Sequence, residues 1–240
     1  MRYKILLIIS LILVLAGCGT TSVPVIDKSP NRKIPPERVV RPGESLYSIA
    51  WEFGLDYKKI AAWNGIKKPY LIQAGQRLRL RPNNNVVATP QPTTKAESSP
   101  TTQTTVTKSK PQNQINFAPT PSRWNWPAEG NLVGRFSRSK GINGIQIAGK
   151  EGSPVRATAS GQVVYAGEGL RGYGKLIIVK HNQDYLSAYA HNQSIIVKEG
   201  QQVKAQQRIA QMGSSGADRT MLHFEIRKGG KPVDPLKYLK

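Results

Sequence analysis

Apolar positions near the start of the chain recur with helical spacing. Four of them fall at i, i+3, i+4 and i+7, which places them on one face of a helix. These residues are Leu46, Ile49, Ala50 and Phe53. Gly54 follows them and is suited to end the helix, because glycine readily adopts the left-handed conformation found after many helices. The pattern predicts a short amphipathic helix that follows a Pro-Gly turn.

A second short helix is predicted directly afterwards. Asp56 is suited to cap it, since a carboxylate there accepts a hydrogen bond from the first turn. Its apolar face would comprise Tyr57, Ile60 and Ala61. Val39-Val40 reads as a strand before the two helices, and residues 77–80 alternate as a strand after them. Residues 38–82 are therefore expected to form a small βααβ module.

The second half of the chain, residues 124–240, shows the pattern of a β domain. Short runs rich in Val, Ile and Tyr are separated by glycines, and few helical periods occur. Predicted strands cover residues 161–166, 176–180, 185–190, 194–197 and 222–227. A polar turn at 181–184 joins the second and third of these as a hairpin, and we expect His181 to be exposed in that turn.

The N-terminus has the pattern of a bacterial export signal. Arg2 and Lys4 precede an apolar run over 5–16, which is too short for a comfortable membrane span. The run ends in Leu15-Ala16-Gly17-Cys18, which resembles a lipobox. The prediction is a lipoprotein signal peptide over 1–17, with lipid on Cys18 and a tether over 18–37. A plain signal peptide, or an uncleaved anchor, is the alternative.

Composition adds a linker and restricts the partners. Residues 83–123 are rich in Pro, Thr, Gln and Ser and poor in aliphatics, so they are predicted to be a disordered linker. The formal charge is +21, which favours polyanions. Export makes anionic envelope material the expected partner, with no nucleic acid. Cys18 is the only cysteine, so no internal disulfide is possible.

Residues 38–82 resemble a LysM domain. The resemblance rests on Pro42-Gly43-Glu44-Ser45-Leu46, on Trp63-Asn64, and on Leu71-Ile72 followed by Gly75-Gln76. It implies binding of N-acetylglucosamine-containing glycans such as peptidoglycan, in a groove between two loops. The glycan-binding residues implied are Gly43, Glu44, Ser45, Leu46, Ile66, Tyr70 and Leu71. Leu46 and Ile66 could instead be core residues, and Trp51 and Trp63 are expected in the core.

Residues 124–240 resemble the lysostaphin-like (LytM) zinc peptidases, whose motifs are His-x-Gly-Ile-Asp and His-x-His. Here Ile142 and Gln146 stand at the two ligand positions of the first motif, and Met221 replaces the first His of the second. His223 alone keeps a ligand position, and His191 matches a catalytic His. Three protein ligands are needed, so neither a metal nor another cofactor is expected. A weak site at His191 and His223 stays open.

The expected fold class is α+β and multidomain: the βααβ LysM module, a flexible linker and a mainly antiparallel β domain of LytM type. A cleft without zinc is suited to hold a partner segment. The residues expected to line it are Ile142, Gln146, Tyr173, His191, Met221 and His223.

Lipobox, LysM, linker and degenerate LytM domain together resemble the NlpD-type murein hydrolase activator lipoproteins. The resemblance implies a non-enzymatic outer-membrane lipoprotein that faces the periplasm, is enriched at the division septum and is held to the membrane through the lipid on Cys18. It would bind peptidoglycan and activate a periplasmic N-acetylmuramyl-L-alanine amidase for cell separation. Two alternatives remain: a passive peptidoglycan-binding tether, or an active zinc murein endopeptidase.

Overall fold

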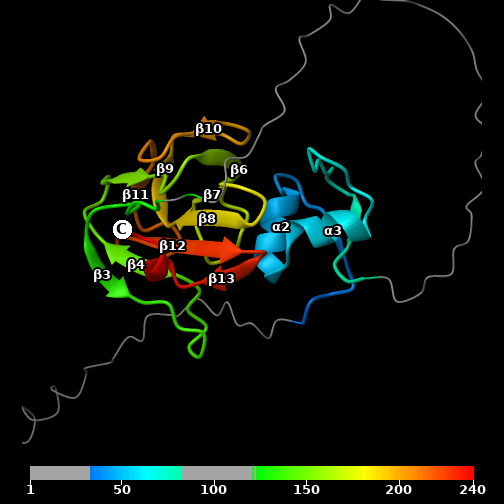
Figure 1. The fold of residues 1–240 in the computed structure, drawn as a ribbon, viewed down its shortest axis with the longest axis horizontal. Coiled ribbons are helices and arrows are strands. Elements are labelled where there is room, and N and C mark those ends of the chain that lie inside the picture. The colour runs from blue at the N-terminus through cyan, green and yellow to red at the C-terminus, as the bar shows by residue number, and fades with distance from the viewer. Residues whose placement is uncertain (1–32, 83–120, 122) are drawn as a thin grey trace, which may run out of the picture.

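The structure is a computed structural model that describes residues 33–82, 121 and 123–240 (Figure 1). These residues form an N-terminal module, residues 33–82, and a larger C-terminal domain, residues 123–240. The predicted signal peptide, Cys18 and nearly all of the predicted linker lie outside the described residues. Within the described part of the chain, no helix is both long and apolar enough to cross a membrane.

The N-terminal module has the predicted βααβ order. Its elements are β1 (Glu37–Val39), α2 (Leu46–Phe53), α3 (Tyr57–Trp63) and β2 (Arg77–Arg79), with β1 and β2 antiparallel. Ser45 caps α2 by accepting a hydrogen bond from the Ser48 N–H at 3.2 Å, and Asp56 caps α3 through the Lys58 N–H at 2.9 Å. Gly54 ends α2 in the left-handed conformation, with φ 62°. Local capping chemistry therefore sets the bounds of both helices.

Two antiparallel sheets build the C-terminal domain. The large sheet has the order β10-β6-β7-β8-β12-β4-β3, with β13 paired to β12, and the small sheet has the order β5-β11-β9. The strands are β3 (Asn131–Gly134), β4 (Ile145–Ala148), β5 (Pro154–Arg156), β6 (Gly161–Gly167), β7 (Leu176–Lys180), β8 (Tyr185–Ala190), β9 (Asn192–Ile195), β10 (Gln202–Val203), β11 (Arg208–Met212), β12 (Met221–Lys228) and β13 (Lys231–Val233). A single 3-10 turn, Pro235–Lys237, is the helical element of this domain.

The large sheet has two different faces, as β12 shows. Leu222, Phe224 and Ile226 are fully buried in a core shared with the small sheet, and we call this side the inner face. Residues between them point the opposite way, because side chains alternate along a strand. That outer face carries His223, Glu225 and Arg227, which are polar or charged and yet also buried.

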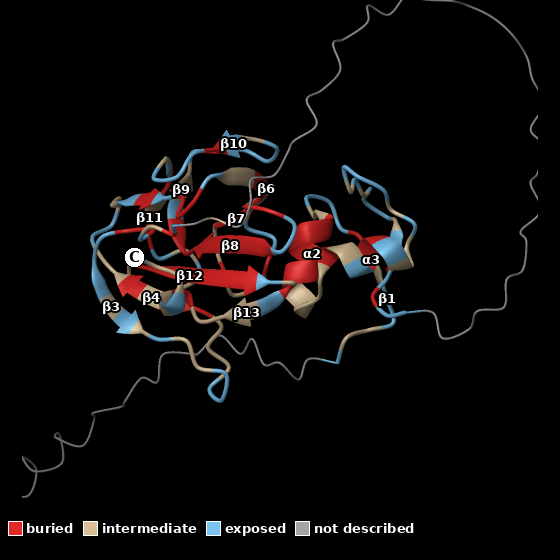
Figure 2. Ribbon diagram, viewed as in Figure 1, coloured by how far each residue is buried: buried red, intermediate tan, exposed pale blue. Residues whose placement is uncertain are grey.

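Part of the outer face is covered by the N-terminal module. A single apolar cluster joins residues of α2 and α3, such as Leu46 and Ile60, to Tyr165, Ile178 and Ala188 of the large sheet. Figure 1 shows α2 beside the ends of β8 and β12, and Figure 2 shows that most of β8, β12 and α2 is buried. The two parts of the chain are thus docked against each other.

The apolar pattern identifies the long strands and not the short ones. The β7–β8 hairpin and β12 lie where they were predicted, because each has enough residues to show a pattern. Six further strands, each of two to five residues, escape that pattern: β3, β4, β5, β10, β11 and β13. Such short strands are held by their neighbours rather than by a local preference.

Candidate functional site

The residues predicted to line a cleft come from three neighbouring regions of the large sheet. Gln146 on β4 lies directly opposite His223 on β12. His191 follows β8, and its N–H donates to the Tyr173 carbonyl in the β6–β7 loop at 2.9 Å. The His223 ring lies 6.0 Å from the His191 ring and 6.1 Å from the Tyr173 ring, centroid to centroid. The structure therefore brings these four residues to one region of the outer face.

The other ligand-motif positions hold side chains of different chemistry. Ile142 lies half-buried in the β3–β4 loop, where its backbone forms a two-hydrogen-bond bridge with Ser137. Met221 begins β12 and is 3% exposed. Gln146 packs over Gly134, since a Cβ at Gly134 would lie 2.6 Å from the Gln146 Oε1. These positions are therefore filled by packed apolar or neutral groups.

Glu225 is the centre of a buried polar network on the outer face. Its Oε1 accepts a hydrogen bond from the Tyr173 hydroxyl at 2.9 Å and lies 2.9 Å from the His223 Nε2. Its Oε2 accepts from Nε and Nη2 of Arg227 at 3.1 and 3.0 Å. Arg227 also donates to the Trp51 carbonyl at 2.7 Å. The network connects Tyr173 and His223 to α2 of the N-terminal module.

Sequence reasoning missed Glu225 and Arg227. They lie two and four residues after His223 on the same strand, so all three share one face. That spacing was the signal that could have identified them. In β12, apolar residues alternate with His223, Glu225 and Arg227, and this alternation indicates two buried faces of different chemistry.

Tyr173 is held as a hydrogen-bond donor. Burial raises its pKa well above the usual value of 10, and the nearby charge of Glu225 raises it further, while Arg227 acts in the opposite direction. The phenol therefore keeps its proton at any physiological pH. A neutral phenol that donates to a buried carboxylate helps to satisfy the charge of Glu225.

His191 is held by the loop after β11. Its side chain is fully buried, and its Nδ1 lies 2.8 Å from the Ser215 carbonyl oxygen. Gly174 makes this approach possible, because a Cβ there would lie 2.0 Å from the same oxygen. The backbone of His191 has φ 66°, a conformation that non-glycine residues rarely adopt. The backbone of His191 is therefore strained while its imidazole is fully packed, so the surrounding structure holds this side chain in one position.

The donor set does not fit the catalytic zinc that a lysostaphin-like fold implies. Such a site needs three protein ligands. Ile142 has no donor atom, Gln146 offers a neutral amide, and the Nε2 of His223 is engaged with Glu225. In the described ranges, no group of three or more His, Cys, Asp or Glu side chains is arranged to hold a metal ion.

The prediction that His181 is exposed is wrong. Its side chain is 2% exposed, with Nδ1 2.9 Å from the Ser160 carbonyl oxygen and Nε2 2.7 Å from the Ser187 hydroxyl. The Trp124 ring packs against it at 4.7 Å between ring centroids. Burial lowers the pKa of His181 to about 4. A polar turn sequence did not reveal that a distant tryptophan covers this imidazole.

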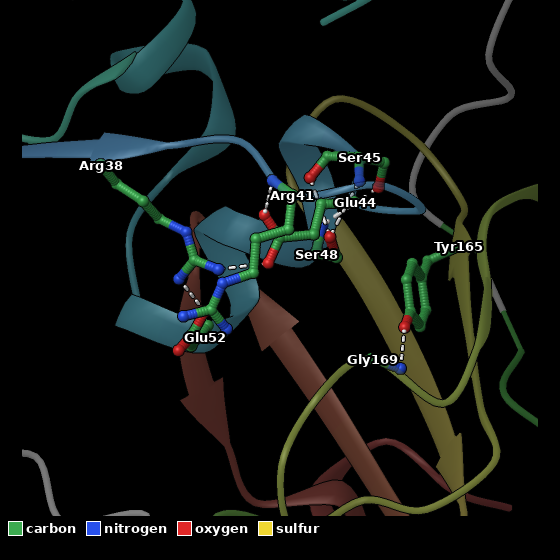
Figure 3. Close-up of polar contacts among 8 residues, drawn as sticks. All are labelled: Arg38, Arg41, Glu44, Ser45, Ser48, Glu52, Tyr165 and Gly169. Carbon is green, nitrogen blue, oxygen red and sulfur yellow. Dashed lines mark hydrogen bonds and ion pairs between the residues drawn. The ribbon is translucent and has the colours of Figure 1, made fainter. Parts of the chain in front are cut away.

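The residues predicted to bind glycan lie in two loops of the N-terminal module. Gly43, Glu44 and Ser45 form the turn before α2, where Glu44 pairs with Arg38 and also accepts a hydrogen bond from the Arg41 N–H. Figure 3 shows this turn facing Tyr165 of β6. The remaining positions divide between buried Leu46, half-buried Ile66 and Tyr70, and exposed Leu71. Trp51 is buried, as expected of a core residue.

The chain matches two known families. Residues 39–81 match the LysM domain, and residues 140–235 match peptidase family M23. Among solved structures, the chain is similar to a putative peptidase M23 from Pseudomonas aeruginosa, with 29% identity over 50% of this chain and 52% of that chain, and a TM-score of 0.47. A zinc containing peptidase from Vibrio cholerae shows 30% identity over 47% and 39%, with a TM-score of 0.43.

Curated relatives cover much more of the chain. A lipoprotein NlpD/LppB homolog of Pseudomonas aeruginosa is 43% identical over 94% of this chain and 88% of its own length. The murein hydrolase activator NlpD of Escherichia coli K12 is 41% identical over 83% and 66%. Outer membrane antigenic lipoprotein B of Histophilus somni is 43% identical over 81% and 64%. The chain therefore belongs to the NlpD/LppB lipoprotein family, with a LysM domain and a peptidase family M23 domain.

Proposed function

We propose that the protein is a non-enzymatic activator of a periplasmic N-acetylmuramyl-L-alanine amidase, and that its M23 cleft is the surface that binds the amidase. The observation that carries this proposal is the set of Ile142, Gln146 and Met221 at the metal-motif positions. These side chains remove the metal chemistry but leave a formed site on the outer face. Relatives named murein hydrolase activators support the same conclusion.

Activation requires that the cleft bind the active form of the amidase more tightly than the inactive form. Among the residues of the proposed cleft, Ile142 and Gln146 are half-buried and accessible to a partner segment with an apolar face, whereas Met221 is 3% exposed. The buried network around Glu225 holds Tyr173 and His223 in place, so the partner meets a preformed surface. Preformed surfaces bind with a smaller loss of conformational entropy.

Two further features would place the activator at its substrate. Lipid on Cys18 would anchor it to the outer membrane, facing the periplasm, and the LysM domain would bind peptidoglycan. A relative named outer membrane antigenic lipoprotein B is consistent with that location. Enrichment at the division septum would follow from the place where the amidase cleaves the wall.

The test is release of labelled fragments from purified sacculi. A soluble chain beginning after Cys18 is assayed alone and together with a periplasmic amidase of the same organism. The expected result is no release alone and strong stimulation of the amidase. Release by the chain alone, with loss of activity in a chelator, would identify a zinc endopeptidase instead. Binding to sacculi without any effect on an amidase would identify a passive tether.

A matched pair of variants locates the partner surface. Gln146→Lys places a charge in the cleft, while Gln162→Lys makes the same change on β6 at another half-buried position. We expect stimulation to fall about tenfold or more with Gln146→Lys, the size of effect that truncating an interface anchor produces. Gln162→Lys should stimulate like the unmodified chain, and equal loss in both variants would move the partner site elsewhere.

A further inference from the structure

The docked module turns its predicted glycan-binding loops toward the C-terminal domain. In the first loop, the Ser45 hydroxyl donates to the Val164 carbonyl of β6 at 3.1 Å. In the second loop, the Tyr70 ring lies 5.7 Å from the Lys180 Nζ of β7. Leu46, between these loops, is fully buried. Ser45 and Tyr70 are half-buried and Leu46 is buried, so docking restricts the access of a sugar chain to these three positions, while Gly43 and Leu71 stay exposed.

Lys180 of β7 is buried against aromatic residues of the N-terminal module. It is 2% exposed, although it is a lysine, and its Nζ lies 3.3 Å from the Tyr47 hydroxyl. Three tyrosine rings of the module surround this ammonium group, with centroid distances of 5.5, 4.9 and 5.7 Å for Tyr47, Tyr57 and Tyr70. Aromatic faces attract cations, so these rings hold Lys180 in the docked state. Sugars also pack well on exposed tyrosine rings, and the same surface can serve either purpose.

The same contact reaches the cleft. The Arg227 guanidinium stacks on the Trp51 ring of α2 at 3.7 Å and donates to the Trp51 carbonyl. Arg227 also binds Glu225, which contacts His223. The docked module therefore lies directly beside the proposed amidase-binding surface. A partner segment that follows the outer face toward Arg227 would meet α2.

The chemistry of this contact suits a reversible interface. Its polar pairs include Lys58 with Asp184 at 2.9 Å, and Lys231 with the Gly54 carbonyl at 3.3 Å. Two charged groups, Lys180 and Arg227, are buried by the docking and would regain water on separation. Interfaces between domains of one chain are generally more polar than obligate ones, and relative motion of the domains is expected.

We propose that glycan strands and the outer face of the M23 domain compete for one surface of the LysM domain, so that peptidoglycan binding undocks the LysM domain and uncovers the part of the outer face around Arg227, beside the proposed amidase-binding surface. The regulatory consequence rests on the proposed function, whereas the competition itself does not. A ligand that binds only the undocked form shifts the equilibrium between docked and undocked forms toward the undocked form. When the ligand concentration is a hundred times its dissociation constant, the shift is about a hundredfold. Binding to the cell wall would then permit activation of the amidase.

A zero-length cross-link measures docking directly. A carbodiimide can join Lys58 to Asp184, because their side chains are in contact and both are partly exposed. The soluble two-domain chain is cross-linked with increasing amounts of a chito-oligosaccharide, and the linked peptide is quantified by mass spectrometry. We expect the yield to fall as the oligosaccharide binds. An unchanged yield at saturation, with binding shown by calorimetry, overturns the competition.

Two neighbouring glycines provide a matched pair of variants. A Cβ at Gly230 would lie 2.3 Å from the Leu55 backbone oxygen, whereas a Cβ at Gly229 meets nothing within 4 Å. Both residues have positive φ, 79° and 54°, so alanine strains the β12–β13 turn in either case. Gly230→Ala should therefore lower the cross-link yield well below that of Gly229→Ala. Thermal unfolding of both variants checks that the M23 domain stays folded.

The affinity for glycan gives the second measurement. When a binding-competent form is only partly populated, the apparent dissociation constant is raised by that fraction. Gly230→Ala should therefore bind the chito-oligosaccharide more tightly than Gly229→Ala, by about threefold or more. Equal affinities despite a lost cross-link overturn the competition, and so does an absence of binding by both variants.

An amidase assay separates this proposal from the proposed function. Without glycan, Gly230→Ala is expected to stimulate the amidase more than Gly229→Ala does. If neither variant nor the unmodified chain stimulates any amidase, the proposed function fails while the cross-link and affinity results still decide the competition. If all three stimulate equally, the amidase does not need the covered part of the outer face, and the regulatory half of the proposal is overturned.

Discussion

The two faces of the large sheet are buried for different reasons. The inner face is apolar, with Leu222, Phe224 and Ile226 packed against the small sheet of the same domain. The outer face carries His223, Glu225 and Arg227, and a separate module covers part of it. Burial of the inner face is therefore inseparable from folding of the M23 domain. Burial of part of the outer face depends on a contact between two domains, the contact that we propose a glycan displaces.

The largest expected effect is on the inner face. Phe224→Ala removes a fully buried ring that packs 5.3 Å from the Tyr189 ring, between centroids. We expect the free energy of unfolding to fall by about 4 kcal/mol, as for other buried aromatic truncations. Urea unfolding measures it. Val133→Ala, at an exposed position of β3, should change the free energy of unfolding by less than about 0.5 kcal/mol. Similar losses in the two variants would contradict the assignment of Phe224 to the buried core.

Acid should also act on the inner face, through His181. Its pKa is about 4 in the folded protein and about 6.5 when exposed. The unfolded chain therefore takes up this proton first as the pH falls, and stability is lost between about pH 6.5 and pH 4. The loss at pH 4 relative to pH 7 should be about 3 kcal/mol from this group. Urea unfolding at the two pH values tests this, with His181→Gln expected to show a smaller difference.

On the outer face, Arg227→Met should have an intermediate effect. It removes two hydrogen bonds to the Glu225 carboxylate, one to the Trp51 carbonyl and one to the Tyr173 hydroxyl. We expect a loss of about 2 kcal/mol in unfolding free energy, because Glu225 keeps other partners and gains water if the module separates. In the double variant with Glu225→Gln, the two losses should not add, since both changes break one network. Simple additivity would show that the network does not act as a unit.

The smallest effect should come from the rim of the docking contact. Lys58→Ala removes the exposed ion pair with Asp184. Exposed pairs contribute little, so docking should weaken by less than about 1 kcal/mol. Hydrogen exchange of the β7–β8 turn reports on this change, with Lys59→Ala, an exposed position of the same helix, as the control. A larger effect than that of Arg227→Met would mean that the rim, and not the Arg227–Trp51 contact, holds the module.

Much of the local structure could be predicted from local patterns. Helices α2 and α3 lie where their apolar spacing places them, and Asp56 caps α3 as predicted. The β7–β8 hairpin follows from two Val- and Ile-rich or Tyr-rich runs around a polar turn. The replaced ligand positions could also be read directly, because each is a residue identity. These features depend on residues close together in the sequence, where propensity and capping act.

Other features depend on contacts between distant residues. His181 is covered by Trp124, and Arg227 meets Trp51 from another domain. A period of two along β12 shows that His223, Glu225 and Arg227 share a face, but it does not show what lies against that face.

The sequence by itself determined the two domain types, the caps and long strands, and the absence of three metal-motif side chains. Only the tertiary structure decided that His181 is buried, that Glu225 organises the outer face, and that the LysM domain turns its predicted glycan loops onto that face. The physical reason is that a residue is buried and loses its water only when a second surface packs against it. A residue pattern specifies one surface, and the surface that packs on it comes from residues far away in the sequence, 57 positions for Trp124 on His181 and 133 positions for Tyr47 on Lys180.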